Sequence, residues 1–96
     1  MGKQVYSNRE YKIYEVGKNN YIVHNSHKPF QEGHTHIHNF STAKYLTKLA
    51  THKFVPDHLS EYLLISLIRI SKDNKYIEAV KKALAVQRSS GGNTNE

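Results

Sequence analysis

The spacing of hydrophobic residues along this chain changes near residue 40. Before that point, apolar and polar residues tend to alternate, and after it the apolar residues recur every three or four positions. Alternation is typical of a strand with one buried face, whereas a period of 3.6 is typical of an amphipathic helix. The pattern therefore predicts an α+β fold, with strands in the first part and helices in the second.

Two strands and a tight turn are expected near the N-terminus. Glu10 to Val16 is rich in tyrosine and β-branched residues, as is Tyr21 to His24. Such residues favour strands. Gly17-Lys18-Asn19-Asn20 lies between them, and glycine and asparagine tolerate the positive φ angles of tight turns. These segments predict a β-hairpin.

A short third strand is expected from His34 to His38, after a loop over 25–33 that contains Pro29 and Gly33. If this strand pairs antiparallel with Tyr21–His24, the register decides whether His24 shares its face with His34. The sequence leaves that register open. Residues 1–8 carry little pattern and are expected to form a loose lead-in.

Three helices are expected in the second part, each with a candidate start signal. The first covers about 42–53 with Ser41 as N-cap, the second about 57–71 with Asp57 at its start, and the third about 74–88 with Ser71 or Asp73 as cap. Apolar residues surround most of the second helix, which predicts that it lies at the centre of the core.

Together these elements predict one α+β domain over residues 1–88. Its β-rich part, 9–38, forms a β-hairpin or a small three-stranded antiparallel sheet that packs on a three-helix part, 41–88. Residues 89–96 have no apolar side chain and contain two adjacent glycines. This segment is expected to be a disordered tail.

Composition excludes several classes of protein. The chain has no cysteine, which rules out disulfides and thiolate zinc sites and fits a reducing compartment. No apolar run approaches the ~18 residues of a membrane helix, and the N-terminus lacks the apolar core of a secretion signal. We expect a cytoplasmic protein without a membrane partner.

The charge balance indicates a polyanionic partner. Fourteen lysines and arginines against eight acidic residues give a net charge of +6. Basic proteins attract nucleic acids and acidic proteins. Interleaved basic and aromatic residues suit single-stranded nucleic acid, and the candidates for this surface are Lys12, Tyr14, Lys18, Tyr21 and Lys28, joined by Lys44 and Lys48 of the first helix.

Histidines form the second chemical signal. His34, His36 and His38 occupy alternate positions, so a strand would place them on one face, and His24 is a possible neighbour. Neutral imidazoles bind zinc, nickel and copper, and three protein ligands plus water are typical of catalytic zinc. The four histidines are therefore candidate ligands for zinc or another divalent metal. The competing interpretation is a solvated strand face without a metal.

The segment His34-Thr35-His36-Ile37-His38-Asn39-Phe40 also resembles the signature of histidine-triad nucleotide hydrolases and transferases, although Thr35 and Asn39 replace residues that are apolar in that family. The resemblance implies that His36 attacks phosphorus while His34 and His38 hold or protonate phosphate oxygens.

The function that these signals favour is a non-enzymatic accessory or regulatory module that binds a polyanion, above all nucleic acid. One alternative is a small metal-dependent or histidine-triad-like phosphoryl-transfer enzyme that uses His34, His36 and His38. Another is a protein-interaction module that inhibits or modulates a larger enzyme. The sequence does not choose between RNA, DNA and protein as the partner.

Overall fold

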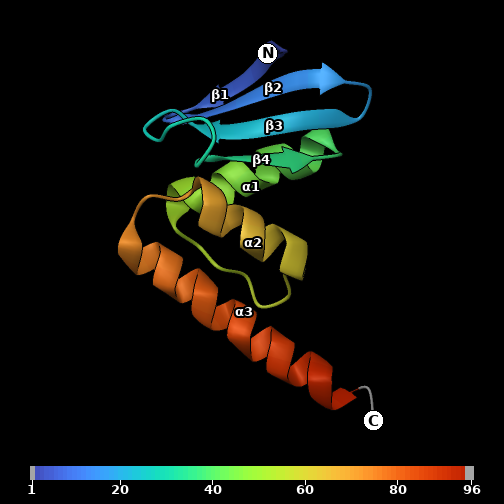
Figure 1. Ribbon diagram of the computed structural model, residues 1–96, viewed down its shortest axis with the longest axis vertical. Coiled ribbons are helices and arrows are strands. Elements are labelled where there is room, and N and C mark those ends of the chain that lie inside the picture. The colour runs from blue at the N-terminus through green and yellow to red at the C-terminus, as the bar shows by residue number, and fades with distance from the viewer. Residues whose placement is uncertain (1, 95–96) are drawn as a thin grey trace.

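The computed structural model describes the backbone of residues 2–94 and the side chains through Ser89. The elements follow one another in the order β1 (Lys3–Asn8), β2 (Tyr11–Gly17), β3 (Asn20–Asn25), β4 (His34–Ile37), α1 (Phe40–His52), α2 (Glu61–Ile70) and α3 (Asn74–Thr94). This is the predicted α+β arrangement, with a sheet followed by three helices (Figure 1).

The sheet has four antiparallel strands in the order β1-β2-β3-β4, one more than expected. The predicted lead-in over residues 1–8 was wrong, because residues 3–8 form edge strand β1. Its two adjacent apolar residues, Val5 and Tyr6, break the alternation that marks a strand. The pairing with β2 shifts between Gln4 and Tyr6, and a bulge of this kind inserts an extra residue.

Two of the three predicted helix starts were misplaced. Helix α1 begins at Phe40, and its N-cap is Asn39, whose side chain accepts a hydrogen bond from the backbone N–H of Thr42. Helix α2 begins at Glu61 after its N-cap Ser60. Asp57 therefore lies in the connection before the helix, because Ser60 satisfies the free N–H of Leu63.

Helix α3 starts where expected, since the Asp73 carboxylate accepts hydrogen bonds from the backbone N–H groups of Lys75 and Tyr76. These bonds lower the pKa of Asp73. The helix ends at Thr94 rather than near residue 88. The backbone of 89–94 in the expected tail is therefore helical, and residues 95–96 lie outside the described part.

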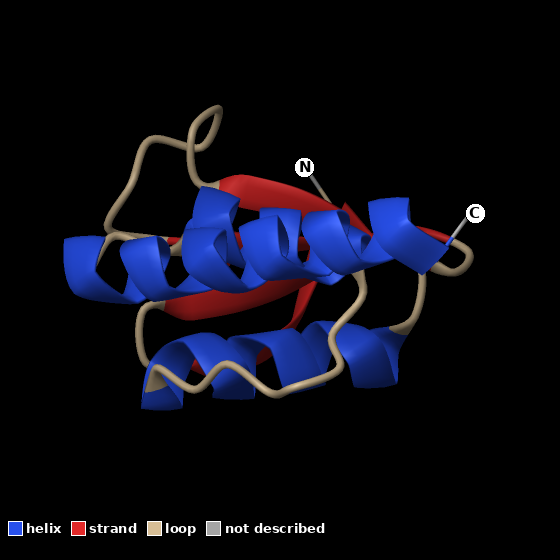
Figure 2. Ribbon diagram, turned by 90° about the horizontal axis from the view of Figure 1, so that it is seen from below, coloured by secondary structure: helices blue, strands red, loops and turns tan. Residues whose placement is uncertain are grey.

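The helices lie on one side of the sheet, and α1 and α2 cover that face (Figure 2). Helix α1 contacts all four strands, α2 packs against β4, β3 and α1, and α3 packs against α2. The sheet lies at one end of the long axis and α3 at the other (Figure 1). The core fills the space between sheet and helices, and its largest fully buried apolar side chains are Ile13, Val23, Ile37, Leu46, Leu67, Ile70 and Val80.

Helix α2 lies in the middle of the helical part but is not buried all round. Leu64, Leu67 and Ile70 are buried, whereas Tyr62 and Ile65 are exposed. The helix therefore has an outer side that reaches the surface beside β4. Within residues 2–94, none of the helices has the length and hydropathy needed to span a bilayer.

Candidate functional site

The face of the sheet that points away from the helices, which we call the open face, consists of two rows that cross all four strands. Residues paired directly across neighbouring strands point to the same side. The strand registers give a first row of Gln4, Tyr14, Ile22 and His36 and a second row of Ser7, Lys12, His24 and His34. None of the helices over 40–94 packs on this face.

Apart from the buried Ile22, the two rows carry polar, aromatic and imidazole groups and no carboxylate. The opposite face is different: its paired residues Ile13, Val23 and Thr35 are buried against the helices. On the open face, His36 is exposed, and Tyr14 is half-buried. The sheet thus separates a buried side that packs on the helices from a side that carries polar and aromatic groups.

Two histidines of the second row hold the loop over 26–33. The carbonyl oxygens of Lys28 and Phe30 can only accept, so His24 Nε2 donates to the first at 3.1 Å and His34 Nδ1 to the second at 2.6 Å. The Phe30 ring stacks on the His34 ring with centroids 4.2 Å apart and contacts the His24 ring at 5.2 Å. The loop therefore extends the open face with another ring.

The histidine row forms in part. His24 lies directly opposite His34, so it joins His34 and His36 on one face, whereas His38 lies beyond the end of β4. The His34 and His36 rings meet edge to face at 5.2 Å. Among the described residues, no group of three metal-ligating side chains converges. The proposed ligand set His24, His34, His36 and His38 therefore does not form a three-coordinate site here.

Helix α2 contributes a polar stripe that runs along the outer edge of β4. Its residues Tyr62, Ser66 and Arg69 follow helical spacing and meet the strand in turn. Tyr62 Oη donates to the His36 carbonyl, Ser66 Oγ lies 2.7 Å from Thr35 Oγ1, and Arg69 Nε donates to the His34 carbonyl at 2.9 Å.

These contacts cover the edge of β4, where unpaired carbonyl groups would otherwise invite another strand. They also place the exposed Tyr62 ring and the Arg69 guanidinium beside the open face. Sequence reasoning missed both residues. Their signal was weak: three polar groups at helical spacing in an otherwise apolar segment.

The structure divides the residues predicted to bind nucleic acid. Lys12 and Tyr14 lie on the open face, and Lys18 lies in the turn between β2 and β3. Tyr21 lies on the helix-facing side, where its ring stacks on Phe40 with centroids 5.4 Å apart. Lys28 Nζ donates to the carbonyls of Arg69 and Ser71 at 2.9 and 3.1 Å, so it ties the loop to the end of α2.

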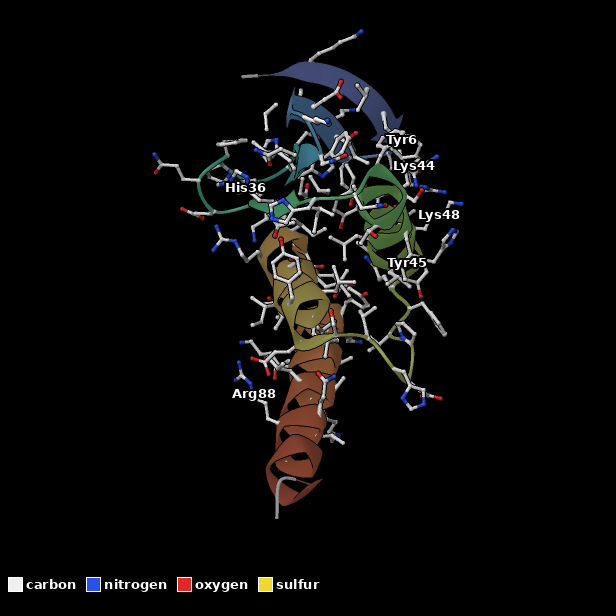
Figure 3. All side chains as sticks on the ribbon, turned by 90° about the vertical axis from the view of Figure 1, so that its right-hand side faces the viewer. Tyr6, His36, Lys44, Tyr45, Lys48 and Arg88 are labelled. Carbon is white, nitrogen blue, oxygen red and sulfur yellow. The ribbon has the colours of Figure 1, made fainter. Side chains whose placement is uncertain are left out.

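Lys44 and Lys48, expected to join the same surface, lie elsewhere. Both are on α1, and Figure 3 shows them on the side of the molecule opposite His36. The lysines that were expected to share one surface are therefore divided between two sides of the molecule.

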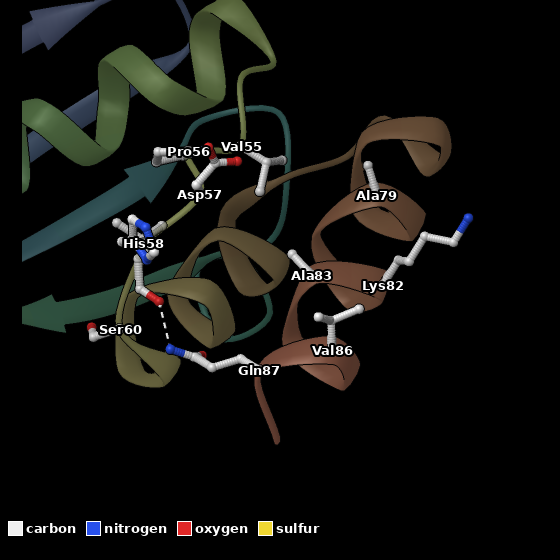
Figure 4. Close-up of a pocket in the computed structure, with 11 residues that line it drawn as sticks. Val55, Pro56, Asp57, His58, Ser60, Ala79, Lys82, Ala83, Val86 and Gln87 are labelled. Atoms are coloured by element: carbon white, nitrogen blue, oxygen red, sulfur yellow. Dashed lines mark hydrogen bonds between the residues drawn. The ribbon is translucent and has the colours of Figure 1, made fainter. Parts of the chain in front are cut away.

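A groove lies between the segment 55–60 and α3, far from the open face (Figure 4). Its volume is about 850 Å³, and its lining is mostly apolar, with Val55, Pro56, Leu59, Ala79, Ala83 and Val86. Asp57 and Lys82 add charges of opposite sign to the lining, and His58 adds an imidazole. This mixture does not select one class of ligand.

Two phenols with raised pKa values lie on the buried side. Burial, together with the Glu10 carboxylate, raises the pKa of Tyr11 to about 12. Burial, together with Tyr11, also raises the pKa of Tyr76, whose hydroxyl donates to the Phe54 carbonyl. Neither group reaches the open face, so both belong to the core rather than to a reactive site.

Comparisons of this chain with protein-family models, with curated proteins and with solved structures gave no match. Function is therefore inferred from the geometry of the open face.

Proposed function

We propose that the protein is a non-enzymatic module that binds single-stranded nucleic acid on the open face of its sheet. The observation that supports this most directly is the first row, where Tyr14 and His36 flank the buried Ile22 and which contains no carboxylate. Exposed rings on a sheet bind unpaired bases by stacking, and every base has a π-face to offer.

Four rings are available around this surface. Tyr14 and His36 belong to the sheet, Phe30 comes from the loop over 26–33, and the exposed Tyr62 ring stands beside His36. They lie around the open side of a sheet on which no helix over 40–94 packs, so together they offer a platform. A platform suits a strand of successive bases better than one small molecule.

Cationic groups border the rings and can contact the phosphates. Lys12 Nζ donates to Ser7 Oγ at 2.9 Å and to the Arg9 carbonyl at 3.3 Å, and its third N–H remains for a phosphate oxygen. Arg69 lies at the β4 edge and Lys18 at the far turn. Contacts of this kind position a strand without reading its sequence.

The enzymatic alternative has less support. A histidine-triad mechanism needs His34, His36 and His38 around one phosphorus atom. Here His34 Nδ1 is committed to the Phe30 carbonyl, and His38 lies outside β4. The nucleophile proposed from the resemblance, His36, is exposed on an open surface rather than enclosed with other catalytic groups.

The test is fluorescence anisotropy with a short labelled oligonucleotide, as RNA and as DNA, single-stranded and as duplex. We expect single strands to bind and Tyr14→Ala or His36→Ala to weaken binding by about 5-fold to 150-fold, as for other base-stacking rings. Lys12→Gln should reduce the slope of log K against log salt by about 0.7.

The matched control for the ring variants is Phe54→Ala, because this exposed ring lies outside the open face. Its affinity should equal that of the wild type. Equal affinity of the Tyr14, His36 and Phe54 variants, or absence of binding at low salt, would exclude the open face as a nucleic-acid surface.

A further inference from the structure

The outer side of α1 carries a basic stripe that the open face does not use. Its residues are Ser41, Lys44, Tyr45, Lys48 and His52, and all except the half-buried Lys44 are exposed. Spacing of three, four and seven residues places them along one side of the helix. At 1.5 Å per residue the stripe is about 16 Å long.

Nothing acidic in the neighbouring sequence neutralises this stripe. From Gly33 to Pro56 the chain has no aspartate or glutamate, while it carries Lys44, Lys48 and Lys53. Lys53 pairs with Asp73, and Arg88 of α3 pairs with Glu61. Lys44 instead places its Nζ 4.8 Å from the centroid of the Phe40 ring.

Lys44 and Lys48 are also four residues apart, so they repel one another on the same helix. Like charges at this spacing destabilise a helix unless an anion lies between them. Phosphate would supply that anion, and the hydroxyl groups of Ser41 and Tyr45 can donate further hydrogen bonds to it.

We propose that this stripe binds the phosphate backbone of a second nucleic-acid segment, so that one molecule holds two strands on opposite sides. The geometry supports separate strands, since Lys44, Tyr45 and Lys48 lie on the far side of the molecule from His36 (Figure 3). An anionic membrane fits less well, because a helix at a bilayer surface needs a free apolar side. The apolar side of α1 packs in the core, where Ala43, Leu46 and Leu49 are buried.

This inference adds a surface to the proposed function but does not depend on which rings the first strand uses. Its consequence is bridging: a protein with two polyanion surfaces brings two strands together, whereas a protein with one surface does not.

The experiment mixes the protein with two oligonucleotides of one sequence, one carrying a donor and the other an acceptor dye. We expect energy transfer with the wild type and its loss in Lys44→Gln/Lys48→Gln, while anisotropy still reports one bound strand. The control Lys81→Gln/Lys82→Gln changes the charge equally on α3, and should keep the transfer.

Transfer that persists in the α1 variant, or binding by the wild type without transfer, would overturn the inference. So would complete loss of binding in the α1 variant, because α1 would then be the main surface. Vesicles containing phosphatidylserine provide the other test: retention of the wild type but not of the α1 variant, without an effect on oligonucleotides, assigns the stripe to membranes. A different result would show that the proposed function itself is wrong: Tyr14→Ala and His36→Ala would then bind the oligonucleotide with the affinity of the wild type.

Discussion

Tyr11 is the residue whose titration should be visible in the stability of the fold. Its ring is buried on the side of the sheet that faces the helices. This burial and the charge of the nearby Glu10 carboxylate raise the pKa of Tyr11 from 10.0 to about 12. A pKa that is higher in the folded state means that folding favours the protonated phenol. The resulting stabilisation is complete below pH 10 and is lost as the pH rises towards 12.

We therefore expect the urea midpoint to fall between pH 10 and pH 12, and to fall less steeply in Tyr11→Phe. Urea titrations of both proteins at several pH values measure this difference. Tyr45→Phe is the control, because its ring is exposed at 44%. The same steepness in wild type and Tyr11→Phe would show that the Tyr11 phenol does not contribute.

At the scale of elements, the N-caps distinguish the observed helix boundaries from those expected from the sequence. The Asn39 side chain accepts from the Thr42 N–H at 3.0 Å, whereas the predicted cap, Ser41, is exposed within α1. Asn39→Ala should cost ~0.5–2 kcal/mol in the free energy of unfolding, and Ser41→Ala less than about 0.5 kcal/mol. Urea denaturation compares the two, and the reverse order would return the cap to Ser41.

Helix α2 permits a second prediction at this scale. Leu67 is fully buried, Leu63 is half-buried, and Ile65 is exposed at 37%. Leu67→Ala should cost ~2–5 kcal/mol in the free energy of unfolding, because it leaves a cavity in the core. The cost should be smaller for Leu63→Ala and smallest for Ile65→Ala. Equal losses at the three positions would mean that α2 is buried all round, as its composition suggested.

The elements themselves were largely predictable, because the periods of two and 3.6 are local properties of the sequence. The hairpin, the third strand and the three helices lie close to their expected ranges. Strand β1 was missed because a bulge breaks its alternation. Helix ends were misplaced because several residues near each start are good caps, and tertiary packing decides which of them is used.

The candidate site was less predictable, because it depends on contacts between distant segments. Register alone places His24 beside His34 and turns Tyr21 towards the helices. Tyr62 donates to the carbonyl of His36, which lies 26 positions earlier in the chain, and Arg69 donates to the carbonyl of His34, which lies 35 positions earlier. No local pattern could have separated Lys12 from Lys44, which the fold places on opposite sides of the sheet.

At the scale of the whole molecule, the partner can be identified by what stabilises the folded protein. A ligand that binds only the folded state stabilises the protein by about 2.7 kcal/mol when its concentration is a hundred times Kd. The melting temperature of the protein rises as a result. The described residues bring no three metal-ligating side chains together, while the open face offers rings and Lys12 to a strand. A single-stranded oligonucleotide should therefore raise the melting temperature, and zinc should not.

This difference is measured by thermal unfolding of the protein with oligonucleotide, with zinc and with neither. The effect of the oligonucleotide should shrink at higher salt, because binding to phosphates releases counterions and is therefore weaker when the salt concentration is high. The variant His36→Ala is measured both with oligonucleotide and with zinc, because His36 belongs to the first row of the open face and to the predicted set of metal ligands. If it reduces the effect of the oligonucleotide, the open face is the binding surface. A rise with zinc that disappears in His36→Ala, and also below about pH 6 where imidazoles are protonated, would instead establish a metal site and contradict the assignment to nucleic acid.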